Sequence, residues 1–297
     1  MSADGVLNFC KPRGMTSQSA VNTVKRIFGA QKAGHCGTLD PDACGVLPVM
    51  LGKAVRLSEY LTDHDKSYKA FIGFGKTTDT GDAGGKTLSE NGYIPPFEEI
   101  KRAAASFVGG YEQLPPMYSA LKINGQKLVN AARKGVEIER RPRFVNISRC
   151  AAEEEAGMVA LYVECSRGTY IRTLCEDIAR GAGALGYMES LCRTRVGEFR
   201  IEDSVTLDEL KTMDACGREK LLIPVCAVLS SLPELRLAPF HEKLIRCGCA
   251  VDVRKIAPSL PPEEREYRLY GENGFFATGK TTFSDGILCL KQKKLFV

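Results

Sequence analysis

The sequence predicts an α+β protein with a mixed, mostly antiparallel sheet at its core and a small β-rich domain at its C-terminus. Segments with the period of strands and segments with the period of helices do not alternate regularly along the chain. Turn signals typical of hairpins recur between strand segments, and hairpins join antiparallel strands. From about Ser230 onward, short apolar pieces separated by proline and glycine replace the helical patterns. We therefore expect two domains, over residues 1–230 and 231–297.

The first hundred residues contain clear periodic segments. An apolar strand over 6–10 precedes the turn Lys11-Pro12-Arg13-Gly14, and a helical stripe over 20–28 follows, with Ser17 as the expected N-cap. Alternation over 68–74 places Tyr68 on the apolar side of a strand. The other expected elements of this half are a buried strand over 46–51, a helix over 54–61, a glycine-rich loop over 77–85 and a helix over 100–107.

The second half of the large domain continues with hairpins and short helices. Asn124-Gly125 predicts a hairpin turn, and the block 143–167 contains two strands joined near Ala156-Gly157. A clean apolar stripe begins a helix near Tyr170. Thr206-x-x-Glu209 is a capping box for a short helix.

Composition excludes several classes of protein. Of the 297 residues, 44% are hydrophobic and 26% are charged, as in ordinary globular proteins. No apolar run reaches membrane-spanning length, and the first residues lack the layout of a signal peptide, so we expect a cytoplasmic protein without membrane contact. The twelve cysteines are scattered without metal-ligand spacing, and most lie among apolar neighbours. We expect them to be buried, reduced side chains.

Basic residues form local clusters although the net charge is only +5. Each cluster alone is typical of a solvated face, but their recurrence favours a polyanionic partner. The clusters are Arg140-Arg141-Pro142-Arg143, Arg193 with Arg195, and Lys291 with Lys293 and Lys294.

Two short motifs match familiar patterns and are rejected. Residues 274–281 fit a phosphate-binding loop by letter, but bulky residues fill the variable positions and no helical pattern follows the lysine, so two short strands are expected. The span 79–90 has the glycine and final glutamate of a calcium loop, but Gly81 and Ala83 replace its central ligands.

The loop from Gly34 to Gly45 is the most informative segment of the chain. Its three glycines permit backbone angles closed to other residues, and Pro41 restricts both itself and Asp40. Such a loop is suited to holding one carboxylate in place. Its alternative role is a tight turn in which the aspartate caps the next helix.

The order of residues in this loop resembles the catalytic motif of the TruB-type tRNA pseudouridine synthases, G-H-x-G-[ST/A]-L-D-P-x-A-x-G-x-L, at every fixed position through Leu47. Further segments over roughly the first two hundred residues are similar to signatures of that family, in the same order. They are Lys11-Pro12-x-Gly14-Met15-Thr16-Ser17, Tyr68-Lys69-Ala70, Thr77 to Asp82, Pro116 to Lys122 and Cys165 to Arg172.

The resemblance implies a pseudouridine synthase fold and an isomerase that converts uridine to pseudouridine at position 55 in the T-loop of tRNA. Asp40 would be the nucleophile, Tyr68 would stack on the flipped-out base, and Arg172 would pair with Asp40. Such a pair would depress the pKa of Asp40. Otherwise Tyr68 is a core residue and Arg172 a surface partner of Glu176. The reaction gains no atom and changes no oxidation state, so we expect no cofactor and no metal.

Other residues have supporting roles in this prediction. His35 would stack against the T-loop, Tyr170 would pack against Asp40 or the substrate, Leu191 would line the uracil pocket and Asp82 would join a polar network. Phosphate contacts are expected from Lys11, Lys122, Arg193 and Arg195.

The C-terminal domain corresponds in position to the family's PUA-type RNA-binding domain, which would contact the acceptor-stem side of tRNA. It could equally pack without touching RNA. A monomer is the default expectation. We also expect no guide RNA, because the chain is compact and lacks long basic tails. A catalytically silent RNA-binding or RNA-folding protein on the same scaffold is the alternative, and the presence of Asp40, Tyr68 and Arg172 together favours the enzyme.

Overall fold

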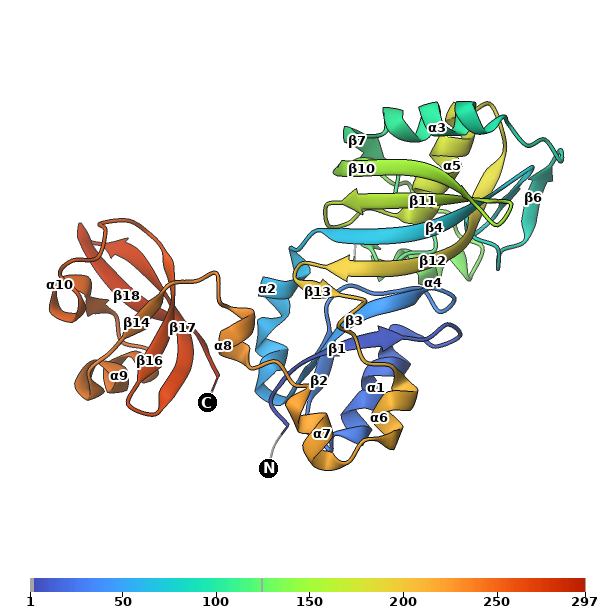
Figure 1. The fold of residues 1–297 in the computed structure, drawn as a ribbon. Helices are drawn as coiled ribbons and strands as arrows, with labels where there is room; N and C mark the ends of the chain where they lie inside the picture. The colour runs from blue at the N-terminus through green and yellow to red at the C-terminus, as the bar shows by residue number, and fades with distance from the viewer. Residues whose placement is uncertain (1–2, 124, 297) are drawn as a thin grey trace.

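The computed structural model describes residues 3–123 and 125–296, which build one large and one smaller sheet (Figure 1). Neighbouring strands of the large sheet are antiparallel except at β3 and β12, so the predicted α+β core with a mostly antiparallel sheet is confirmed. In spatial order the strands are β1 (Gly5–Lys11), β3 (Cys44–Leu51), β12 (Gly186–Val196), β4 (Lys66–Phe74), β11 (Met158–Cys165), β10 (Arg143–Glu155) and β7 (Gly109–Gln113), with β2 (Ala33–His35) beside β3 and β13 (Phe199–Arg200) beside β12.

The parallel contact between β3 and β12 is short, and we call it the seam. It consists of two residue pairs, Cys44 with Cys192 and Gly45 with Arg193, whereas the ladders on either side run the length of their strands. Gly45 has a φ of +103°, and a Cβ there would lie 2.2 Å from the carbonyl oxygen of Arg193. Only glycine fits this position, because any side chain would force the strands apart.

Each half of the sheet has its own helices and its own core. Helices α3 and α5 pack on β4, β10, β11 and β12, and α1 packs with α6 on β1 and β3 (Figure 1). The helices of the large domain are α1 (Ser17–Ile27), α2 (Ser58–Thr62), α3 (Phe97–Ser106), α4 (Leu128–Ala132), α5 (Ile171–Gly181), α6 (Leu207–Thr212), α7 (Ala215–Lys220) and α8 (Val225–Val228).

The alternating burial of β4, the turn between β10 and β11 and the capping box of α6 are present as predicted. Tyr68, Ala70 and Ile72 of β4 are buried on one face. The turn between β10 and β11 uses positive φ at both Ala156 and Gly157. The capping box at the start of α6 is present.

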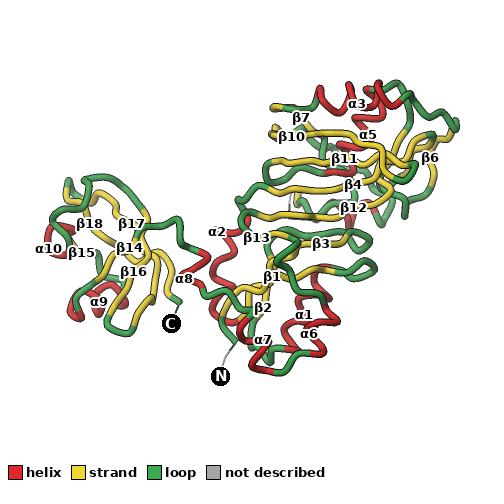
Figure 2. Tube along the Cα trace, viewed as in Figure 1, coloured by secondary structure: helices red, strands yellow, loops and turns green. Residues whose placement is uncertain are grey.

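Two hairpins of short strands project from the loops, as the tube in Figure 2 shows for the region around β6. They are β5 (Lys76–Thr78) with β6 (Thr87–Glu90), and β8 (Lys122–Ile123) with β9 (Gln126–Lys127). The second pair flanks the predicted turn: Gly125 has a φ of +80°, while Asn124 lies outside the described residues.

Three local predictions are wrong. Thr16, not Ser17, caps α1, because its extended backbone lets its hydroxyl accept from the amide of Ser19. The expected helix over 54–61 is largely the 3₁₀ helix Gly52–Leu57, followed by the short α2. Residues 274–284 form one long strand, β17, because both of its edges are paired, with β16 and β18.

The expectation that most cysteines are buried is also wrong. Only four of the twelve are buried, and all twelve are free thiols. The buried ones are Cys36, Cys150, Cys165 and Cys175. Composition did not reveal this, because strand alternation turns Cys10, Cys44 and Cys192 toward partly exposed surroundings. Within the described ranges, no helix combines the length and apolar character needed to span a membrane.

The smaller sheet, which Figure 2 shows apart from the large one, has its own hydrophobic core around Leu269, Phe276 and Leu290. Its order is β14 (Glu234–Arg236), β16 (Glu266–Gly271), β17 (Gly274–Ser284), β18 (Ile287–Leu295) and β15 (Val251–Asp252), with helices α9 (Pro239–Arg246) and α10 (Val253–Ile256).

The smaller sheet is fastened to α2 of the large domain. The Tyr60 hydroxyl lies 3.0 Å from the Thr278 hydroxyl, and Lys293 and Lys294 form ion pairs with Glu59 at 3.3 and 2.9 Å. Phe296 is buried in a core of the large domain. Two of the three lysines predicted to meet a polyanion therefore hold the two sheets together.

One hydrogen-bonded contact fixes the loop that precedes β3. The Ser17 hydroxyl donates to the carbonyl of Leu39 (2.9 Å) and accepts from the amide of Leu39 (2.8 Å), and all these groups are buried. We expect Ser17→Ala to lower the free energy of unfolding by about 1–3 kcal/mol, because it leaves buried backbone groups without partners. Urea unfolding measures this change. Ser19→Ala, an exposed position of the same helix, is the control, and equal effects of both substitutions would contradict the assignment.

Candidate active site

A cavity of about 430 Å³ lies beside the seam and gathers residues from both halves of the sheet. Asp40 enters it from the loop before β3, Tyr68 from β4 and Leu191 from β12, while Tyr170 and Arg172 come from the start of α5. The Asp40 side chain is 38% exposed, so its carboxylate is accessible from the cavity. The sequence prediction that these five residues share one site is matched by their placement.

Arg172 is the centre of the polar contacts in this cavity. Its Nε lies 3.0 Å from Oδ2 of Asp40, while Nη1 and Nη2 donate to the carbonyls of Thr80 and Tyr118, each at 2.8 Å. The side chain is 7% exposed and occupies the first turn of α5. Among the described residues its carboxylate partners are Asp40 and Asp82, not Glu176.

These contacts show what two of the family-like segments contribute to the site. Residues 77–82 supply the carbonyl of Thr80 and the carboxylate of Asp82, which lies 3.8 Å from Nη1 of Arg172. Asp82 is itself oriented by the Thr80 hydroxyl at 2.6 Å. Residues 116–122 supply the carbonyl of Tyr118. Asp82 thus joins the polar network that the sequence predicted.

The predicted depression of the Asp40 pKa is wrong. Burial raises the pKa of the Asp40 carboxyl above its ordinary value, and the opposing positive charge of Arg172 only partly offsets this. The negative charge of Asp82 raises the pKa further, and Lys11 lowers it. The sequence indicates the nearby cation but not the cost of removing water from the carboxylate.

A buried lysine holds the Asp40 loop in place. Lys11 is fully buried, and its Nζ donates to the carbonyls of Pro12, Met15 and Pro41 at 2.9, 2.6 and 3.1 Å. The expected phosphate contact of Lys11 is therefore wrong, because its three donors are engaged inside the protein.

The chain leaves the Asp40 loop directly into β3, so the alternative of a helix-capping aspartate is wrong. Gly37 and Gly45 have positive φ, as the loop requires, whereas Gly34 lies in β2 with ordinary strand geometry.

Tyr170 is fixed by a residue that the sequence analysis missed. Gln113 on β7 is buried; its Nε2 donates to the carbonyl of Tyr170 (3.0 Å), and its Oε1 accepts from the amide (2.8 Å). No pattern in the sequence indicated this glutamine, since it ends the short strand Gly-Gly-Tyr-Glu-Gln, which has no apolar periodicity.

Arg193 and Arg195 lie on opposite faces of the sheet. Arg193 faces the cavity, is 1% exposed and donates to the carbonyls of Val46 (2.8 Å) and Gly37 (3.1 Å). An irregularity in the β12–β4 register falls between the two arginines, which pair with Tyr68 and Ser67 respectively. Arg195 consequently lies on the outer face.

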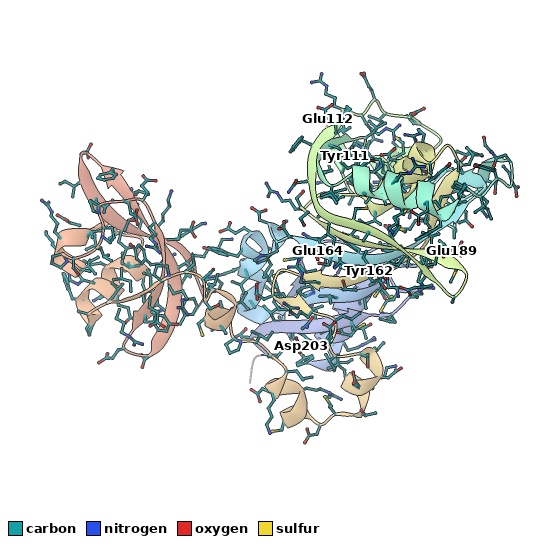
Figure 3. All side chains as sticks on the ribbon, turned by 45° about the horizontal axis from the view of Figure 1, so that its top comes forward. Tyr111, Glu112, Tyr162, Glu164, Glu189 and Asp203 are labelled. Atoms are coloured by element: carbon teal, nitrogen blue, oxygen red, sulfur yellow. The ribbon has the colours of Figure 1, made fainter. Side chains whose placement is uncertain are left out.

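On that outer face, Arg195 pairs with Glu164 at 3.1 Å. Figure 3 labels Glu164 near Tyr162, which lies two residues earlier on the same strand. The predicted phosphate contact of Arg193 is therefore wrong, because its side chain is buried. The phosphate contact of Arg195 stays a prediction. Lys122 is exposed on β8 and remains a candidate for such a contact.

Lys66 and His35 complete the surroundings of the site. Lys66 is buried, lines the cavity and donates to the carbonyl of His64 at 2.6 Å. Residues two apart on a strand point to the same face, so the position of Lys66 relative to Tyr68 could have predicted that it lines the cavity. His35 lies at the end of β2 outside the cavity lining, and burial lowers the pKa of its imidazole. In the part of the chain that the structure describes, no three His, Cys, Asp or Glu side chains are arranged to hold a metal ion.

The arrangement supplies a carboxylate with a fixed direction at the wall of a partly apolar cavity. An arginine fork holds it, and an aromatic ring and an aliphatic side chain line the space that it faces. Such a site suits attack by a carboxylate on a planar, partly apolar substrate group.

Comparison with known proteins identifies relatives of this arrangement. Residues 25–171 match the N-terminal domain of the TruB family of pseudouridylate synthases, and residues 172–231 match the C-terminal domain of tRNA pseudouridylate synthase B. The chain is 46% identical over 279 residues to tRNA pseudouridine synthase B of Dechloromonas aromatica, covering 93% of this chain and 91% of the relative. It is 41% identical over 293 residues to the protein of the same name from Aromatoleum aromaticum, covering 98% and 92%.

A solved structure shares the fold of this chain. A chain in the crystal structure of a Cbf5-Nop10-Gar1 complex superposes with a TM-score of 0.72 at 26% identity, covering 99% of this chain and 85% of that one. With these relatives and family domains, the chain belongs to the TruB family of pseudouridylate synthases.

Proposed function

We propose that this protein isomerises uridine to pseudouridine in tRNA, at position 55 of the T-loop, with Asp40 as the nucleophile. The observation that carries the proposal is the Asp40 carboxylate, paired with Arg172 at 3.0 Å and facing a cavity lined by Tyr68 and Leu191. The relatives named above carry the name of this activity.

The reaction needs few parts. The bond between N1 of uracil and C1′ of ribose breaks, a bond between C5 and C1′ forms, and one proton is transferred in net from C5 to N1. Asp40 supplies an electron pair at the junction of sugar and base, which requires its ionised form. Since no atom is added and no electron is lost, the reaction calls for no cofactor.

The other cavity residues contact the uracil while its bond to the ribose is broken. Tyr68 and Leu191 provide apolar surfaces against which the flipped-out uracil stacks and turns. Tyr170, held by Gln113, closes the side next to Asp40. Arg172 keeps Asp40 aimed and limits the rise of its pKa.

Residues outside the cavity hold the RNA in this proposal. His35 stacks on the T-loop, which suits a neutral imidazole of lowered pKa better than an acid–base role. Lys122 contacts phosphate from its exposed position. Residues 231–297 act as a PUA-like domain that reaches the acceptor stem, and Lys291 is the lysine of its basic cluster that forms no ion pair among the described residues.

We further propose that the protein works in the cytoplasm as a monomer without a guide RNA. The decisive test incubates nuclease-treated, purified protein with an unmodified tRNA transcript and maps any pseudouridine formed. Pseudouridine at position 55 is expected. Its absence, or a requirement for added RNA, would contradict the proposal, and sedimentation of the same sample reports the oligomeric state.

We expect Asp40→Asn to lower turnover by roughly a thousandfold or more while tRNA binding stays close to that of the unaltered protein, because the amide cannot act as nucleophile. Single-turnover kinetics and filter binding measure the two quantities. Asp42→Asn, an exposed aspartate two residues away, should retain activity. Substantial turnover by the Asp40 variant would remove Asp40 from its role.

We expect Arg172→Lys to lower turnover by a factor on the order of ten or more, because one ammonium cannot hold Asp40 and two carbonyls in the geometry of a guanidinium. The control is Arg180→Lys, an exposed position on the same helix. If both variants had unaltered kinetics, the positioning role of Arg172 would be wrong.

The pH dependence should follow the charges around Asp40. Turnover falls as the pH drops through the Asp40 pKa, since only the carboxylate is active. Asp82 raises that pKa, so Asp82→Asn should move the acid limb of kcat to lower pH. Asp203→Asn, exposed in the turn after β13 and labelled in Figure 3, should leave the limb in place. A move to higher pH in the Asp82 variant would contradict the electrostatic account.

A further inference from the structure

Two cysteines face each other across the seam, on the side of the sheet away from the cavity. Cys44 of β3 and Cys192 of β12 are direct partners in the parallel ladder, and both are partly exposed free thiols. Their side chains lie on the same face because they are in register, while the adjacent Arg193 points into the cavity. Neither cysteine has a part in the isomerisation described above.

The geometry of this pair is compatible with a disulfide. Adjacent strands lie about 4.8 Å apart, and disulfides form between residues whose Cα atoms are about 4.4–6.8 Å apart. The Sγ of Cys44 also lies 3.7 Å from the carbonyl oxygen of Leu191, the residue next to Cys192. The Cys44 sulfur is thus already directed at the partner strand.

The surroundings make Cys44 the reactive member of the pair. A hydrogen bond from the Cys192 thiol and the exposed guanidinium of Arg13 lower the pKa of the Cys44 thiol. The thiolate is the reactive form of cysteine toward oxidants. Cys10 lies close by on β1, but burial raises the pKa of its thiol, and the described residues offer no third ligand arranged for a metal. A thiol pair, rather than a metal site, is what the seam contains.

We propose that Cys44 is a peroxide-reactive thiol that forms a reversible disulfide with Cys192 and thereby lowers turnover. The Cys44 thiolate attacks hydrogen peroxide, the O–O bond breaks, and the departing hydroxide takes up a proton to become water. Cys44 is then a sulfenic acid. Cys192 attacks its sulfur, the S–S bond forms, and the sulfenic hydroxyl leaves as a second water with the proton of Cys192. Two thiols and one peroxide give one disulfide and two waters.

The effect on turnover follows from where the seam lies. Asp40 precedes Cys44 by four residues, whereas Leu191 and Arg193 flank Cys192. A disulfide requires its two Cβ atoms to approach to about 3.8 Å, closer than neighbouring strands otherwise place them. With only two residue pairs in the seam, closing this bond moves the Asp40 loop relative to the other wall of the cavity.

The chemical half of the proposal is tested without any assay of activity. Reduced full-length protein is treated with one equivalent of hydrogen peroxide, alkylated, digested with trypsin and analysed by mass spectrometry. We expect fragment 33–53 joined to fragment 181–193, with fragment sequencing placing the link at Cys44 and not at the buried Cys36. In Cys192→Ser, dimedone should trap a sulfenic acid at Cys44; in Cys44→Ser, neither product should form. Peroxide oxidation at other cysteines with Cys44 and Cys192 unlinked would overturn the proposal.

The functional half is tested on the same samples with an unmodified tRNA transcript. Turnover of the oxidised protein should fall at least about tenfold, since a misplacement of about 1 Å in an active site costs up to about a hundredfold. A dithiol reductant should restore it. Cys44→Ser and Cys192→Ser should stay active after peroxide, and the exposed Cys216→Ser should behave like the unaltered protein. A mapped disulfide with unchanged turnover would overturn the regulatory role, even though the modification site stood.

Discussion

The guanidinium of Arg172 is the contact on which the rest of the site depends. A planar group with fixed donor directions binds Asp40, the carbonyl of Thr80 and the carbonyl of Tyr118 at once. These partners come from three loops that are far apart in the sequence. Without a buried cation at the start of α5, the loops would have no common anchor, and the burial that raises the pKa of Asp40 would lose the larger of the two positive charges that oppose it.

The seam explains why such an anchor is needed. The cavity lies where the two halves of the large sheet meet, and the halves share only two residue pairs in their ladder. Side chains supplement this short ladder: Arg193 reaches from β12 to the carbonyls of Val46 and Gly37, and Ser17 and Lys11 hold the Asp40 loop from the other half. The site is therefore formed by side chains from both halves of the sheet, which meet at the seam, and not by one rigid element.

The sequence predicted the carboxylate and the residues around it, but not which lysine and arginine side chains are buried inside the protein. Asp40, Tyr68, Tyr170 and Arg172 lie in ordered motifs, and together with Leu191 they line one cavity. The basic residues next to those motifs were less predictable, because the letters Lys and Arg do not reveal burial: Lys11 is enclosed by three carbonyls. A change of register between residues 193 and 195 sends two nearby arginines to opposite faces, and no periodicity marks it. Ser17 appeared to be a cap because its second partner, Leu39, is twenty-two residues away.

The burial of Phe296 has a consequence for how the protein is made. Its ring packs into the same core as Val6, Val46 and Leu57, which belong to the first strands of the large sheet and the segment that follows them. A ribosome releases the chain from its N-terminus, so that this core stays open until residue 296 has emerged from the exit tunnel. The first strands of the large sheet therefore complete this core only after the segment that contains Phe296 has been synthesised.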